Sequence, residues 1–204
     1  MFSRSLLFAL ALGTLSAPAR EIHDLVYAAP GGHQLILDLD LPDEIKEPVP
    51  LVIMIHGGGW SSGTRTAFTA PELVEEGFAV ATIDYRLSPE FQFPAHIQDV
   101  KAAIRFLRVH AAEYHINPDR IGLWGSSAGA HLAVLSALSG PSAGWDVGEN
   151  LGVPSDVQAV VDWYGPTTFQ GLENAPESSR NTVRQAFGND SLVWRQASPL
   201  FLVH

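Results

Sequence analysis

The feature that most constrains this chain is the segment Gly125–Gly129 (GSSAG), which has the form G-x-S-x-G. The apolar run before it, 120–124, predicts a buried strand, and the helix-forming run after it, 130–138, ends before Gly140-Pro141. A serine placed at a sharp turn from strand to helix is typical of a nucleophile elbow, where side chains two residues away on either side would collide. The alternative is a Gly/Ser-rich connection without chemistry, because short motifs recur by chance.

Two further segments favour the elbow interpretation. His56–Trp60 (HGGGW) follows the apolar run 51–55, and Asp84–Pro89 follows the apolar run 78–83. Both segments are expected at the carboxyl ends of strands, where open α/β sheets bind their ligands. Strands that alternate with helices in this way predict an α/β fold with a mostly parallel sheet and right-handed crossovers.

The remaining pattern predicts the other elements. Residues 23–41 are expected to form two strands joined by a turn at 30–32, because leucines alternate with other residues from Leu35 to Leu41. Helices are expected within 66–76 and over 94–114, the latter with an apolar stripe, and a strand over 157–164. Residues 117–119 are expected to end the connection before the elbow strand. Periodicity is weak over 167–197, which predicts a cap or substrate-facing loop with a short helix near 179–187.

These motifs resemble those of the bacterial α/β-hydrolase esterases and lipases that have an HGGG oxyanion loop and are related to hormone-sensitive lipase. Within that group the chain is most similar to the acetyl or feruloyl esterase-like branch. The resemblance extends from about residue 25 to the C-terminus. The residues that support it are 56–60, 84–89, 93–95, 99 and 125–133. It implies an α/β-hydrolase domain over 20–204, with a mostly parallel sheet and helices on both faces.

Acyl transfer requires a nucleophile and preorganised donors for the oxyanion. Ser127 is the predicted nucleophile, and the backbone N–H of Ala128, the next residue, is one predicted oxyanion donor. The resemblance implies that the Gly57 and Gly58 amides are the others. His56, Asp84 and Arg86 are expected to support the loops around the site.

A serine nucleophile also needs a histidine base and a carboxylate that orients it. In the resembled fold the acid and the histidine follow strands that come later in the chain. The resemblance implies that this sequence contains neither of these two positions. It therefore predicts a domain that is incomplete at its C-terminus. His131 is one turn after Ser127 but is expected to pack or to form hydrogen bonds beside the elbow, and Asp162 is expected to be structural. His96, His110 and His115 are expected to be surface or satisfied residues, and His204 has no support to fix it.

Composition excludes several other functions. The formal net charge of −10 argues against a nucleic-acid or anionic-membrane partner, and the absence of cysteine excludes disulfides and thiolate chemistry. No metal-ligand spacing is present, and HGGGW lacks the Gly-Lys-Ser/Thr of a phosphate-binding loop, so no metal or cofactor is expected.

Residues 1–19 have the form of a secretory signal peptide, although a buried helix is the alternative, and the apolar run is too short for a membrane anchor. The expected location is therefore secreted or periplasmic.

The expected function is a serine carboxylic-ester hydrolase that acts on short acyl or aryl esters through an acyl-enzyme. The resemblance suggests esters linked to polysaccharide. Two alternatives stay open. The chain could be a truncated, inactive hydrolase that binds ligands, or an amidase or peptidase that uses the same site.

Overall fold

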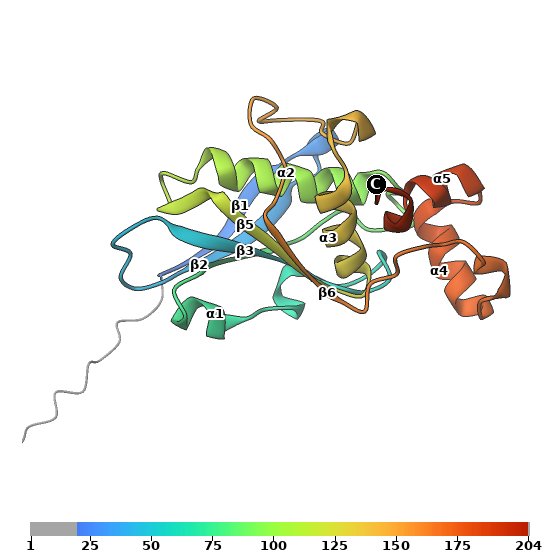
Figure 1. Ribbon diagram of the computed structural model, residues 1–204, viewed down its shortest axis with the longest axis horizontal. Coiled ribbons are helices and arrows are strands. Elements are labelled where there is room, and N and C mark those ends of the chain that lie inside the picture. Colours follow the sequence, from blue (N-terminus) through green and yellow to red (C-terminus); the bar gives the residue numbers. More distant parts are fainter. Residues whose placement is uncertain (1–19, 204) are drawn as a thin grey trace, which may run out of the picture.

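A computed structural model describes residues 20–203, and the predicted signal peptide and His204 lie outside the described residues. A six-stranded sheet in the order β1-β2-β4-β3-β5-β6 forms the centre of the molecule (Figure 1). The strands are β1 (Arg20–Ala28), β2 (Leu35–Leu41), β3 (Val49–Ile55), β4 (Ala79–Ile83), β5 (Ile116–Ser126) and β6 (Ala159–Trp163). β1 and β2 are antiparallel, and β4, β3, β5 and β6 are parallel to one another. The predicted α/β-hydrolase topology is thus confirmed.

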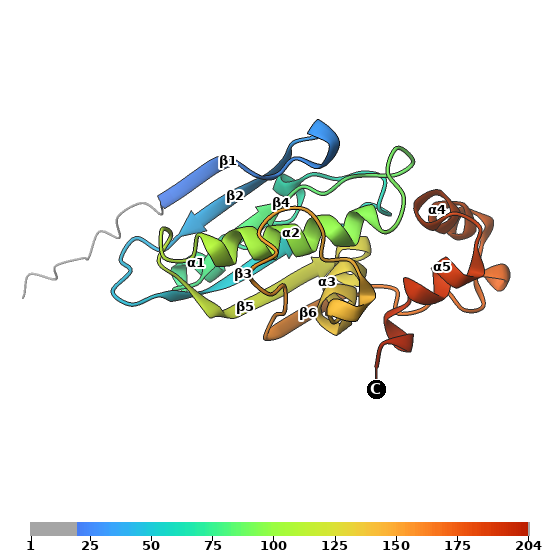
Figure 2. The ribbon, with the colours of Figure 1, turned by 90° about the horizontal axis from the view of Figure 1, so that it is seen from above.

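Helices cover both faces of this sheet, as predicted. Helices α2 (Ala95–Val109) and α3 (Ala128–Leu138) lie on one face, and the short helix α1 (Pro71–Glu75) lies on the other (Figure 1, Figure 2). β3 is at the centre of the sheet between β4 and β5, and β4 is buried along its whole length. A strand covered on both faces carries a nearly continuous apolar sequence: 51–55 is wholly apolar, and 79–83 includes one polar residue, the buried Thr82.

The helix expected within 66–76 is present as α1, which is one and a half turns long and follows a 3₁₀ turn at Arg65–Ala67. Two other expectations from the sequence were wrong in detail. Residues 117–119 lie within β5, which begins at Ile116 and pairs there with Val49 of β3. The segment 167–197 holds two helices, α4 (Glu177–Phe187) and α5 (Ser191–Gln196), where only one was expected. Asp190 caps α5 by accepting a hydrogen bond from the Leu192 N–H at 2.8 Å, which is the local signal that sequence reasoning missed.

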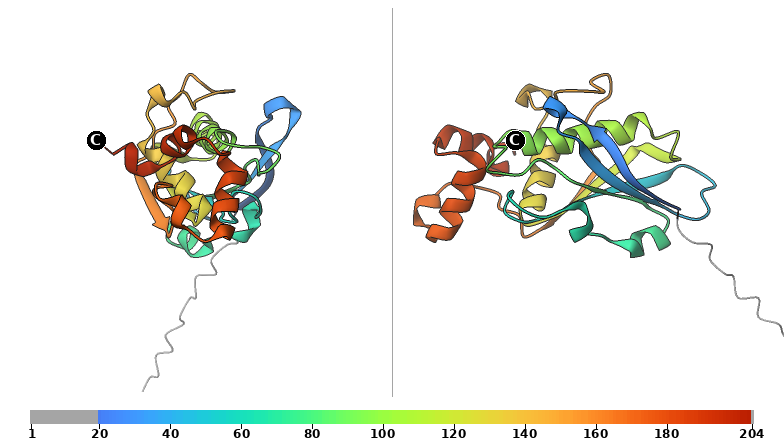
Figure 3. Two further views of the ribbon diagram at one scale, coloured as in Figure 1. Left: turned by 90° about the vertical axis from the view of Figure 1, so that its right-hand side faces the viewer. Right: turned by 180° about the vertical axis from the view of Figure 1, so that it is seen from behind.

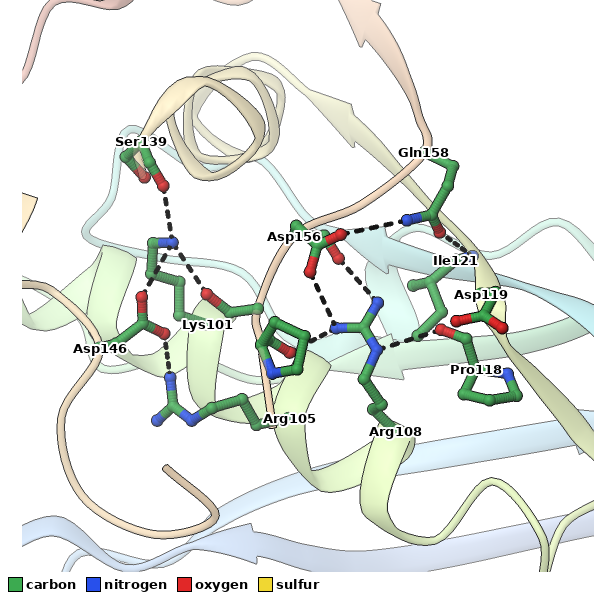
Figure 4. A network of polar contacts seen from close by, with 12 residues as sticks. Lys101, Arg105, Arg108, Pro118, Asp119, Ile121, Ser139, Asp146, Asp156 and Gln158 are labelled. Atoms are coloured by element: carbon green, nitrogen blue, oxygen red, sulfur yellow. Dashed lines mark hydrogen bonds and ion pairs between the residues drawn. The ribbon is translucent and has the colours of Figure 1, made fainter. Parts of the chain in front are cut away.

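The long connection between α3 and β6 is attached to helix α2 by three cationic side chains (Figure 4). Lys101, Arg105 and Arg108 follow one another at helical spacing and are almost wholly buried. The Lys101 ammonium donates to Ser139 O at 3.1 Å and Ser155 Oγ at 2.9 Å. Because these donors meet carbonyl and hydroxyl oxygens as well as Asp146, the buried charges are satisfied and the connection is held against α2.

β6 forms an edge of the described sheet, because it pairs with β5 alone among residues 20–203. Its apolar side chains are partly open to solvent: Val161 is 44% exposed and Trp163 is 47% exposed. Tyr164, directly after the strand, is 76% exposed. This edge is therefore able to pair with a further strand.

Candidate active site

Ser127 lies at the junction between β5 and α3. Its backbone has φ 52° and ψ −115°, a conformation that costs a non-glycine residue about 1–3 kcal/mol. Close packing explains the glycines on either side. A Cβ atom on Gly125 would lie 2.3 Å from the carbonyl carbon of Gly129, and one on Gly129 would lie 2.0 Å from Ile55 O. The turn is therefore a strained elbow that only glycines at these two positions allow.

The HGGGW loop, residues 56–63, follows β3 and approaches this elbow closely. A Cβ atom on Gly57 would lie only 3.4 Å from Ser127 Cβ. Gly58 has φ 113°, and its carbonyl accepts hydrogen bonds from the Ser61 and Ser62 N–H groups at 3.1 Å. No hydrogen bond from the N–H of Gly57, Gly58 or Ala128 is found within the described residues. Free donors beside a serine are what an oxyanion requires, but their catalytic role stays a prediction.

The start of the HGGGW loop is held by His56 and Tyr85. His56 Nδ1 is 2.7 Å from Gly57 O, and the His56 ring stacks on the Tyr85 ring with centroids 4.4 Å apart. The Tyr85 hydroxyl donates to His56 O at 3.0 Å. Burial lowers the pKa of His56 and raises the pKa of Tyr85. Both groups are therefore neutral at pH 7 and serve as hydrogen-bonding and packing elements.

The far end of the same loop is held by Arg65, which sequence reasoning did not single out. The Asp84 carboxylate accepts hydrogen bonds from the Arg65 backbone N–H at 2.7 Å and from its Nη1 at 2.9 Å. Arg65 Nε donates to Asp38 at 2.8 Å, and the guanidinium also pairs with Asp24. Aspartates from three separate segments thus converge on one arginine, and only the fold brings them together.

Arg86 holds the next loop by a different contact. Its guanidinium pairs with Asp99 of α2, with Nη2 at 2.7 Å from Oδ1, and it also donates to Ala95 O at 3.3 Å. The Arg86 backbone N–H donates to the same carboxylate at 2.9 Å. This pair ties the end of β4 to the start of α2 beside the HGGGW loop.

No histidine within residues 20–203 is placed as a base for Ser127, whose Oγ forms no hydrogen bond there. His131 is buried, and both of its ring nitrogens are engaged, with Trp60 Nε1 at 3.2 Å and Ala197 O at 2.7 Å. The Asp162 carboxylate accepts from the Gly165 N–H at 2.7 Å, which is a structural role. The expectation that His96 is a surface or satisfied residue was wrong, because it is wholly buried and neither ring nitrogen has a hydrogen-bond partner within the described residues. His204 lies outside the described residues.

The buried histidines predict a dependence of stability on pH. Burial lowers the pKa of His131 to about 4, and burial together with the positive charges of His131 and Arg86 lowers the pKa of His96 to about 4. Unfolded histidine has a pKa near 6.5, so between about pH 6.5 and pH 4 the unfolded chain binds more protons than the folded one. The free energy of unfolding should therefore fall as pH falls through this window, by on the order of 3 kcal/mol per histidine.

Asp99, whose pKa is raised by burial, acts in the opposite direction at low pH. Denaturant titrations at pH 7 and pH 4.5 check the prediction. His131→Gln should flatten the dependence. Equal stability of the unmodified protein at the two pH values would contradict it.

The cap segment, residues 167–197, lies at one end of the molecule beside the HGGGW loop (Figure 3). A Cβ atom on Gly59 would lie 2.9 Å from Thr182 Cγ2 of α4. The Phe93 N–H donates to Ala186 O at 2.8 Å, which fixes α4 to the loop before α2. The cap segment therefore contacts both the HGGGW loop and the loop before α2.

Among the described residues, no cluster of three or more histidine and carboxylate side chains is arranged to hold a metal ion. No helix of residues 20–203 combines the length and apolarity needed to cross a bilayer.

Comparison with known proteins gives a consistent result. The family model described as BD-FAE matches residues 37–204. Esterase LipQ of Mycobacterium tuberculosis is 33% identical over 198 residues, which is 91% of this chain and 46% of the relative. Carboxylesterase NlhH of the same organism is 37% identical over 134 residues, or 64% of this chain and 39% of the relative. The structure of a truncated carbohydrate esterase from gut microbiota superposes with a TM-score of 0.73 at 31% identity, covering 93% of this chain and 74% of that one. The chain thus spans less than half of the length of these mycobacterial relatives.

Proposed function

The chain belongs to the BD-FAE family of carboxylesterase-type α/β-hydrolases, and we propose that it hydrolyses carboxylic esters through Ser127. In this mechanism Ser127 Oγ bonds to the ester carbonyl carbon while its proton passes to a base. The tetrahedral intermediate then collapses, the alcohol leaves with a proton, and water releases the acid from the acyl-enzyme.

The observation that carries the proposal is the strained backbone of Ser127 next to Gly57. A φ of 52° at a non-glycine residue is retained only where the surrounding structure enforces it, and such strain is concentrated at active sites. The amides of Gly57, Gly58 and Ala128, which donate no hydrogen bond to any of residues 20–203, support an oxyanion site at the same place. One such donor contributes about 3 kcal/mol of transition-state stabilisation in other enzymes.

We propose that the base and its carboxylate partner come from outside residues 20–203. Two observations support this. Both ring nitrogens of His131, one turn after Ser127, are bonded to Trp60 and Ala197, and β6 has a free edge among the described residues where a further strand could bring new residues beside Ser127. On this basis the described residues alone would lack turnover, and the full-length protein would have it.

The proposed substrates are short acyl or aryl esters, including esters carried by polysaccharide. The similarity to a carbohydrate esterase supports this class, and so does the signal-peptide pattern of residues 1–19, which implies a secreted or periplasmic enzyme that meets polymers outside the cell. An amidase would use the same residues, so matched nitrophenyl esters and nitroanilides must be compared. A ratio of kcat/KM in favour of the amide would overturn the ester assignment.

Covalent labelling tests the nucleophile directly. The full-length protein should react with a fluorophosphonate probe at one site, and peptide mass spectrometry should place the adduct on the peptide containing Ser127. Protein denatured beforehand is the control and should remain unlabelled. An adduct on another serine, or none under conditions where hydrolysis is measured, would contradict the proposal.

A further inference from the structure

We propose that Trp60 and His131 are positioning residues for the HGGGW loop. The hydrogen bond between them holds the loop against Ser127, and the cap segment sets the histidine tautomer that makes this bond. The inference rests on the proposed function, because it concerns the geometry of the same site.

The hydrogen-bond chemistry allows only one arrangement. An indole N–H can only donate, so the 3.2 Å contact from Trp60 Nε1 makes His131 Nδ1 the acceptor. The imidazole proton must then be on Nε2, which donates to Ala197 O at 2.7 Å. A neutral His131 in this tautomer satisfies both partners, and Ala197 belongs to the cap segment. The chain of bonds therefore joins the HGGGW loop, the nucleophile helix α3 and the cap.

Trp60 is suited to fix the loop because its own backbone is constrained. Its φ is 59°, in the left-handed region, and its carbonyl accepts from the Ser88 N–H at 2.8 Å. Its buried ring makes edge contacts with His131, Phe169 and Phe187, with centroids 5.2, 5.9 and 4.9 Å apart. Phe169 and Phe187 come from the cap segment, so the cap encloses the side chain as well as setting the tautomer of its partner.

The loop needs such an anchor because its three consecutive glycines, Gly57, Gly58 and Gly59, have no side chains of their own. Glycine adopts many backbone conformations, and Gly57 and Gly58 must hold theirs if their amides are to meet an oxyanion. Arg65 fixes the far end of the loop, and His56 fixes the start. Trp60 is the anchor between them, directly after the glycines.

Three variants of the full-length protein test this. Trp60→Phe removes the indole donor but keeps an aromatic ring in the cage. His131→Gln keeps a donor where Nε2 was and offers no acceptor where Nδ1 was. His131→Asn places an acceptor oxygen near the Nδ1 position without requiring a tautomer, and should rescue the bond.

We expect Trp60→Phe and His131→Gln each to lower kcat for p-nitrophenyl acetate about tenfold, with KM within twofold. Affinity for a trifluoromethyl ketone, which mimics the tetrahedral intermediate, should fall by the same factor, while affinity for the product acid should not change. The double variant should lose about tenfold and not about a hundredfold, because both changes remove one bond. His131→Asn should stay within about threefold of the unmodified protein.

Trp194→Phe is the matched control. It also removes an indole hydrogen bond in the cap region, from Nε1 to Gly188 O at 2.9 Å, but does not touch the loop. It should leave kcat and the ketone affinity unchanged. Unchanged ketone affinity in Trp60→Phe, while Ser127 still accepts the fluorophosphonate, would overturn the positioning role and leave the proposed function intact. An unlabelled Ser127 in the unmodified protein would instead overturn the proposed function itself.

Discussion

Replacing Ser127 with alanine in the full-length protein is expected to lower kcat for p-nitrophenyl acetate by on the order of 10⁶-fold, as loss of the nucleophile does in another serine hydrolase. The physical reason is that the proposed acyl-enzyme forms on Ser127 Oγ, the hydroxyl at the strained strand-to-helix turn. Without Oγ the reaction reverts to attack by water, assisted only by whatever the oxyanion donors contribute. Substrate binding should change little, because the lost atom is small and its contact matters chiefly in the transition state.

The neighbouring serine provides the control. Ser126 ends β5 and has a partly exposed side chain of the same size, but its backbone is that of a strand. Ser126→Ala should therefore keep kcat within about threefold, which is less than one lost hydrogen bond. Steady-state kinetics give kcat for both variants, and circular dichroism shows that each variant is folded. If kcat of Ser127→Ala were close to that of the unmodified protein, the serine mechanism would be wrong.

The second large effect concerns stability. Gly129→Ala should destabilise the fold by about 3 kcal/mol or more, at or above the upper end of the usual cost of overpacking. The new Cβ would lie 2.0 Å from Ile55 O and 2.5 Å from His56 O, and both are backbone atoms of the central strand and the loop that follows it. Neither can move without displacing the HGGGW loop. Helix propensity alone would favour alanine by about 1 kcal/mol, so the sign of the measured change shows which effect dominates.

Gly140→Ala is the matched control, because nothing lies within 4 Å of a Cβ atom there and its φ of −74° suits any residue. Urea titrations of both variants give the difference in unfolding free energy. A stability of Gly129→Ala equal to that of Gly140→Ala would mean that α3 does not approach β3 as closely as described.

Much of this fold could be predicted from residue order. A strand with a continuous apolar sequence, such as 51–55, is expected at the centre of a sheet covered on both faces. The glycines at 125 and 129 are required by the close contacts of a sharp strand-to-helix turn. The proposed nucleophile and the loop facing it are therefore local features, because the chemistry and the backbone requirement lie within a few consecutive residues. The cap was harder to predict, since α4 and α5 are short and their boundaries depend on caps and turns instead of a long apolar period.

The partners of the site were decided only by tertiary structure. Arg65 meets aspartates 19, 27 and 41 positions away, and His131 meets Trp60 and Ala197 at separations of 71 and 66. No spacing rule relates such residues, because their proximity follows from the order of strands in the sheet and the return of the cap over it. The sequence by itself determined which groups could carry acyl chemistry. The fold decided which groups hold them in place, and it committed His131 to a structural hydrogen bond because burial and two fixed partners leave it no free nitrogen.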